Sequence, residues 1–111
     1  MIAYYDIEAF KIQVLTSHKL LNMVKKRDRK VCLEVIHYLK NIKRDYPQIR
    51  AKMDDSINQM KRTYETIEWA EETGYTNHTH YEIVEYVIKE SYGSLFKHMM
   101  LVNPELLKFI D

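Results

Sequence analysis

The sequence predicts an all-α fold, a compact bundle of four main helices and a short C-terminal helix forming a single domain over residues 1–111. Apolar residues recur every three or four positions through most of the chain, the spacing that keeps side chains on one face of a helix. Only two Gly and two Pro occur among the 111 residues, too few for the tight turns of an all-β domain. A chain of this length can bury a core without disulfides or metal ions.

The longest predicted helix spans residues 47–73, and the bundle is expected to be organised on it. Pro47 suits a first helical turn, where its missing N–H is not needed. Gly74 can end the helix by adopting the left-handed conformation. Such a rod would be roughly 40 Å long, so shorter helices are expected to pack along it. Its predicted core face consists of Ile49, Met53, Ile57, Met60, Tyr64 and Ile67.

The first helix is predicted to begin after an N-cap at Asp6 and to end near the charged run 25–30. Tyr5 and Phe10 are spaced to form a hydrophobic staple around that cap. The predicted core face is Ile7, Phe10, Val14, Leu21 and Val24. Other apolar residues fall away from this face, which indicates a helix contacted on two sides: Ile12, Leu15, Leu20 and Met23.

The second helix is predicted from about Arg29 to Arg44, because the residue before Pro47 is pushed out of the helical region. Its apolar face is Val31, Cys32, Val35, Ile36, Leu39 and Ile42. A single cysteine excludes an internal disulfide, and no uncharged apolar stretch is long enough for a membrane span. With no export signal in the sequence, a cytoplasmic location is expected.

The fourth helix is predicted over residues 80–101, with Thr79 and Glu82 spaced as a capping box. Gly93 lies inside the pattern, so the helix either continues through it, with or without a kink, or breaks there. The predicted core face is Tyr81, Val84, Val87, Ile88, Leu95, Met99 and Val102. Asn103 and Pro104 then signal a stop, a new cap and a short helix over residues 105–110.

Charge is distributed unevenly along the chain. The segment 19–52 carries eleven Lys or Arg against three acidic residues, whereas residues 53–111 carry five against eleven. The basic segment can steer an acidic protein, contact the phosphates of a nucleic acid, or pack against the chain's own acidic half. No Gly-rich phosphate loop or helix-turn-helix motif accompanies it. The residues expected to reach a partner are Lys25, Lys26, Arg27, Arg29, Lys30, Lys40 and Arg44.

Trp69 lies opposite the predicted core face of the long helix, on the same strip as Arg62. An exposed Trp beside an Arg is typical of an interface anchor. The alternative is that another helix covers this side of the long helix, which would make Trp69 an ordinary core residue. Both interpretations remain open at the level of sequence.

The sequence contains no catalytic, metal or cofactor motif. His78 and His80 are two residues apart, but no further zinc ligand is spaced to join them. Glu71 and Glu72 are adjacent and therefore point to different sides of a helix, unlike a paired acid and base. Cys32 has no neighbouring base that would activate it. These patterns favour a protein that is not an enzyme and that needs no cofactor.

The leading hypothesis is therefore a small regulator or inhibitor that docks on a larger protein through exposed aromatics and the basic segment. A nucleic-acid-binding module using residues 19–52 is the first alternative. A homodimer is the second, with Ile12, Leu20 and Met23, or Ile83, Tyr86 and Met100, as seams. The ratio of twelve Lys to five Arg is typical of an AT-rich genome such as that of a phage or mobile element.

Overall fold

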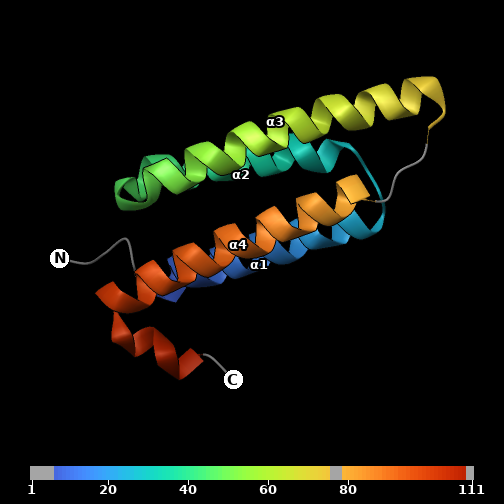
Figure 1. Cartoon of the computed structure of the whole chain (residues 1–111). Helices are drawn as coiled ribbons and strands as arrows, with labels where there is room; N and C mark the ends of the chain where they lie inside the picture. Colours follow the sequence, from blue (N-terminus) through green and yellow to red (C-terminus); the bar gives the residue numbers. More distant parts are fainter. Residues whose placement is uncertain (1–6, 76–78, 110–111) are drawn as a thin grey trace.

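The predicted all-α bundle is confirmed, and its four α-helices follow one another in antiparallel order (Figure 1). The computed structural model describes residues 7–75 and 79–109, and these residues contain no β-strand. The helices are α1 (Ile7–Lys25), α2 (Lys30–Asp45), α3 (Arg50–Thr73) and α4 (Thr79–Val102). Two 3-10 segments, η2 (Pro47–Ile49) and η3 (Pro104–Phe109), precede α3 and follow α4. The expected N-cap at Asp6 and its partner Tyr5 lie outside the described residues.

The helices form two antiparallel pairs, α2 with α3 and α1 with α4 (Figure 1). The pairs pack on each other chiefly through α3 against α4 and α1 against α2. Apolar side chains from all four helices meet in one buried cluster. Its completely buried members include Val31, Leu39, Met53, Met60, Ile88 and Leu95. The C-terminal η3 packs against α4 and places Leu106 in the same core.

The predicted 47–73 helix is shorter than expected, because its first turn is separate. Tyr46 leaves the helical region with φ −131° and ψ 74°, as expected before a proline. Pro47–Ile49 then form the 3-10 turn η2, and the α-helix begins at Arg50. Gly74 ends α3 in the left-handed conformation with φ 75°, as predicted. Helix α3 therefore has 24 residues, the same number as α4, so it is not longer than every other helix as predicted, and it lies along α2 (Figure 1).

The buried face of α1 differs from the predicted one. Leu20, assigned to the second contacted side and not to the main core face, is only 2% exposed, whereas Val14 and Leu21 of the predicted core face are partly exposed. The helix contacts both α4 and α2, so its buried face is rotated toward the groove between them. Ile12 and Leu15 remain on the outside.

The core also contains polar side chains that apolar periodicity does not identify. Tyr38 of α2 is buried, and its hydroxyl lies 3.2 Å from Ser17 Oγ of α1 in a hydrogen bond. Burial raises the pKa of the Tyr38 phenol to about 12, although the hydrogen bond from Ser17 opposes this shift. The pair joins α1 to α2 at a position that the sequence analysis did not predict.

Helix α4 continues through Gly93 without a break. Its core face is confirmed over the residues from Val84 to Met99, but Val102 is 36% exposed because it lies at the helix end. Thr79 is the first described residue of the helix, one residue before the predicted start at residue 80, and Glu82 lies in the first turn. Asn103 Oδ1 accepts a hydrogen bond from the Glu105 N–H at 3.2 Å, which confirms the predicted cap. The segment that follows is a 3-10 helix over Pro104–Phe109 rather than an α-helix.

Replacement of each of the two glycines by alanine is expected to change the free energy of unfolding in opposite directions. Gly93→Ala should raise the free energy of unfolding by about 0.5–1 kcal/mol, since a Cβ at this helical position meets no atom within 4 Å. Gly74→Ala should lower it by about 1 kcal/mol or more, because the left-handed backbone disfavours a Cβ. Urea unfolding of both variants measures the two changes. Destabilisation by Gly93→Ala would contradict an open, regular α4 at this position.

Candidate protein interface

One end of the bundle brings together parts of all four helices (Figure 1). The α1–α2 connector, residues 26–29, lies there together with the last turns of α3 and the first turn of α4. We call this region the Trp69 end. It contains Trp69 and most of the basic residues that the sequence analysis assigned to partner binding.

Backbone hydrogen bonds from the connector to the last turn of α1 end this helix. The Arg27 N–H donates to the Val24 carbonyl at 2.9 Å, and the Asp28 N–H donates to the Met23 carbonyl at 3.3 Å. This pattern is a Schellman motif, in which the residue past the helix adopts the left-handed conformation. Arg27 occupies that position with φ 54°, at a cost of about 1–2 kcal/mol relative to glycine.

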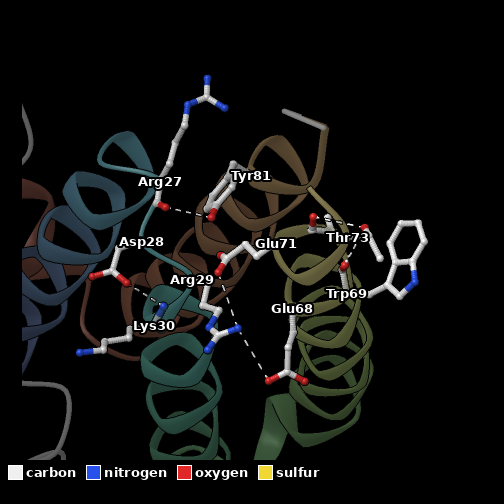
Figure 2. Close-up of polar contacts among 10 residues, drawn as sticks. Arg27, Asp28, Arg29, Lys30, Glu68, Trp69, Glu71, Thr73 and Tyr81 are labelled. Atoms are coloured by element: carbon white, nitrogen blue, oxygen red, sulfur yellow. Dashed lines mark hydrogen bonds and ion pairs between the residues drawn. The ribbon is translucent and has the colours of Figure 1, made fainter. Parts of the chain in front are cut away.

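Tyr81 of α4 holds the connector in place (Figure 2). Its hydroxyl donates to the Arg27 carbonyl oxygen at 2.9 Å, and the Arg27 guanidinium lies 5.8 Å from the centre of its ring. Partial burial, followed by the charge of Glu71, raises the pKa of the Tyr81 phenol. The raised pKa favours the protonated phenol, which is the form that donates this hydrogen bond. Through this bond, α4 holds the backbone of the connector in place.

The Arg29 side chain forms ion pairs with acidic residues of the same chain. Its Nη1 lies 3.7 Å from Glu68 Oε2 and 3.6 Å from Glu71 Oε2, both on α3 (Figure 2). Its guanidinium also lies 5.7 Å from the centre of the Tyr64 ring. Exposed ion pairs of this kind contribute about 0–1 kcal/mol each. Arg29 thus links the start of α2 to α3.

Two further basic residues of the 19–52 segment form ion pairs within the chain. Lys43 Nζ lies 2.6 Å from Asp54 Oδ1, and Arg44 Nε lies 2.9 Å from Asp45 Oδ1. The basic segment is therefore neutralised in part by its own acidic neighbours. Within the described chain, four exposed lysines of the predicted set form no ion pair: Lys25, Lys26, Lys30 and Lys40.

The predicted basic residues do not form one contiguous patch. Lys25, Lys26, Arg27 and Lys30 gather at the Trp69 end, and the Lys30 side chain points away from α3 (Figure 2). Lys40 lies ten residues further along α2, about 15 Å away at the usual rise per residue. Arg44 is more distant still, and it is paired with Asp45.

Trp69 lies on the outer side of α3 with 55% of its surface exposed. None of the other described helices covers it, so the interpretation of Trp69 as a core residue is wrong. Its indole points away from Arg29 and from the bundle (Figure 2). Arg62 is exposed on the same strip of the helix, two turns earlier. The other members of this strip are also exposed: Ala51, Asp55, Asn58 and Glu65.

Tyr75 joins Trp69 in an exposed aromatic pair that the sequence analysis did not identify. Their ring centres lie 6.0 Å apart with the ring planes tilted by 48°, and Tyr75 is also 55% exposed. The contact follows from the left-handed turn at Gly74, which brings the residue after the cap back toward the last turn. An aromatic residue directly after a helix-ending glycine was the available sequence signal.

Two other candidates from the sequence analysis offer little in the structure. Cys32 is completely buried, and burial raises the pKa of its thiol to about 11, which opposes formation of a reactive thiolate. His78 lies outside the described residues, so its pairing with His80 cannot be placed. Among the residues that are described, no three His, Cys, Asp or Glu side chains are grouped to hold a metal ion.

No family model, curated protein or solved structure matches this chain. In the described part of the protein, no helix combines the length and the apolar character that crossing a bilayer requires.

Proposed function

We propose that the protein is a small, non-catalytic binding domain, a regulator or inhibitor, that docks on a larger protein through its Trp69 end. The exposed pair of Trp69 and Tyr75 is the observation that carries this proposal. Large aromatic side chains are costly to leave in water, and Trp and Tyr dominate the binding energy of protein interfaces. The pair projects from the end of a long, well-packed helix, so binding would order few additional side chains.

The lysines of the connector support a second contribution to docking. Lys25, Lys26 and Lys30 are exposed at the same end of the bundle as the aromatic pair. The Lys30 side chain lies on the far side of the Arg29 ion pairs from Trp69 (Figure 2). Exposed charges at the rim of an interface mainly raise the rate of association. The aromatic pair and the lysines are thus proposed to have separable effects on the kinetics of binding.

The proposal is tested by capture of a partner from an extract of the source organism on immobilised protein. A partner should be retained by wild type and by Leu15→Ala, which changes an exposed apolar residue on α1. Trp69→Ala should weaken binding at least about tenfold, mainly through faster dissociation. The double variant Lys26→Glu/Lys30→Glu should instead slow association, as surface plasmon resonance would show. Equal binding by wild type and Trp69→Ala would refute the proposal.

Nucleic acid is the second candidate partner, because the exposed lysines of the connector form no ion pairs within the described chain. Binding of this kind would fall steeply as salt is raised, and would be lost in Lys26→Glu/Lys30→Glu but kept in Trp69→Ala. Nuclease treatment of the extract separates this outcome from protein docking.

Self-association is the third candidate, and burial in the monomer limits which of the two seams could form a dimer. The seam through Ile12, Leu20 and Met23 is incomplete, because Leu20 is buried in the monomer. The seam on α4 keeps Tyr86 exposed, but Ile83 and Met100 are partly buried against the core. Light scattering at micromolar concentration would detect such a dimer.

A further inference from the structure

The C-terminal end of α3 carries negative charge that the helix itself does not balance. The free carbonyls at a helix C-terminus act as roughly half a negative charge, and cations usually occupy the last turn. The last turn of α3 contains no basic residue and instead contains Glu71 and Glu72. Such an arrangement lowers the stability of the helix, and local conflicts of this kind concentrate at functional surfaces.

Arg29 relieves this conflict on one side of the helix only. It pairs with Glu68 and Glu71, which face α2 (Figure 2). Glu65 and Glu72 are exposed and form no ion pair within the described residues. These unpaired carboxylates remain at the end of α3 that carries the aromatic pair.

The unpaired carboxylates flank Trp69. Glu65 is four residues before Trp69 and Glu72 is three residues after it, so all three side chains share one face of α3. Tyr75 adds a second aromatic ring 6.0 Å from Trp69. The surface thus presents two exposed rings bordered by two carboxylates, next to the negative end of a helix.

From this arrangement we infer that the surface formed by Glu65, Trp69, Glu72 and Tyr75 binds an arginine side chain in a basic segment of the protein partner. A guanidinium is planar, so it stacks on an aromatic face while its N–H groups donate to carboxylates. The same cation would balance the negative end of α3. This inference rests on the proposed function, and it specifies which partner chemistry Trp69 contacts.

The chain provides its own probe, because Trp69 is its only tryptophan. The intact protein is titrated with a synthetic peptide of alternating arginine and glycine while Trp69 fluorescence is recorded. The ionic strength is held at about 0.15 M, where charges more than about 8 Å apart are largely screened. The peptide should change the fluorescence saturably, and the peptide with lysine in place of arginine should bind more weakly, because ammonium groups stack poorly.

Two double variants distinguish the site from general attraction between opposite charges. Glu65→Gln/Glu72→Gln should weaken binding of the arginine peptide about tenfold while leaving the aromatic pair intact. Its thermal midpoint should be unchanged or higher, since the helix end loses unfavourable charge. Glu34→Gln/Glu105→Gln makes the same change in net charge at exposed glutamates elsewhere, and should bind as wild type does.

The inference is overturned if the arginine peptide leaves Trp69 fluorescence unchanged, if both double variants lose affinity equally, or if the lysine peptide binds as well as the arginine peptide. If the affinity of a captured partner depends on Trp69 but is unchanged by Glu65→Gln/Glu72→Gln, this inference is refuted and the proposed function is retained. A partner that ignores Trp69 as well would refute both.

Discussion

Leu39→Ala should lower the free energy of unfolding by about 2–5 kcal/mol, the range measured when a large buried side chain is truncated. Leu39 is completely buried on α2, within the apolar cluster to which all four helices contribute. Its removal leaves a cavity that the packed helices can fill only in part. Urea or thermal unfolding measures the change.

Leu33→Ala is the matched control, because it makes the same chemical change on the same helix. Leu33 is 49% exposed, so its truncation should cost less than about 1 kcal/mol. Similar losses for the two variants would mean that α2 does not present its Leu39 face to the core.

The second large effect is a loss of stability at high pH through Tyr38. Burial raises the pKa of this phenol from 10.0 to about 12, so between these values the unfolded chain has lost a proton that the folded chain keeps. Because the unfolded state then binds fewer protons, the contribution of Tyr38 to stability falls as pH rises from 10 toward 12 and is constant below that window. The raised pKa of Cys32 lowers stability in the same way between pH 9 and about 11, and this loss is common to wild type and to variants at Tyr38. A shift of two units corresponds to about 2.7 kcal/mol at most.

The measurement compares urea unfolding of wild type and Tyr38→Phe at about pH 9 and pH 11. Wild type should lose about 1–1.5 kcal/mol more than the variant over this interval. Tyr75→Phe, which alters an exposed tyrosine, should keep the wild-type slope. An identical slope in Tyr38→Phe would show that this phenol is not the group responsible. At neutral pH the variant should cost about 1 kcal/mol, since Ser17 loses its partner.

The helices were predictable because their signals are local. Three- and four-residue spacing located all four helices, and Gly74 was correctly assigned as the end of α3. The pattern of α1 also indicated contact on two sides, but which residues of the second side are buried depends on how α4 and α2 pack on the helix, so Leu20 is buried and Ile12 and Leu15 are not. The proline correctly marked the break at Tyr46, but the turn that it opens is the 3-10 segment Pro47–Ile49, and the α-helix begins only at Arg50.

Only the part of the candidate site that lies on one helix could be predicted, because the other contacts depend on the folded path of the chain. The position of Trp69 opposite the core face follows from the period of one helix, and its exposure agrees with it. Its pairing with Tyr75 requires the path of the chain after Gly74. The neutralisation of Arg29 by Glu68 and Glu71 joins segments far apart in sequence, so charge counts along the chain could not reveal it.

The antiparallel order of the helices has a practical consequence for handling the protein. The first residue of α1 and the last residue of α4 lie at the same pole of the bundle, opposite Gly74 (Figure 1). A dye or solid support attached at either of these two residues would therefore sit about the length of a helix away from Trp69. Tethering by both routes should leave the aromatic pair equally accessible.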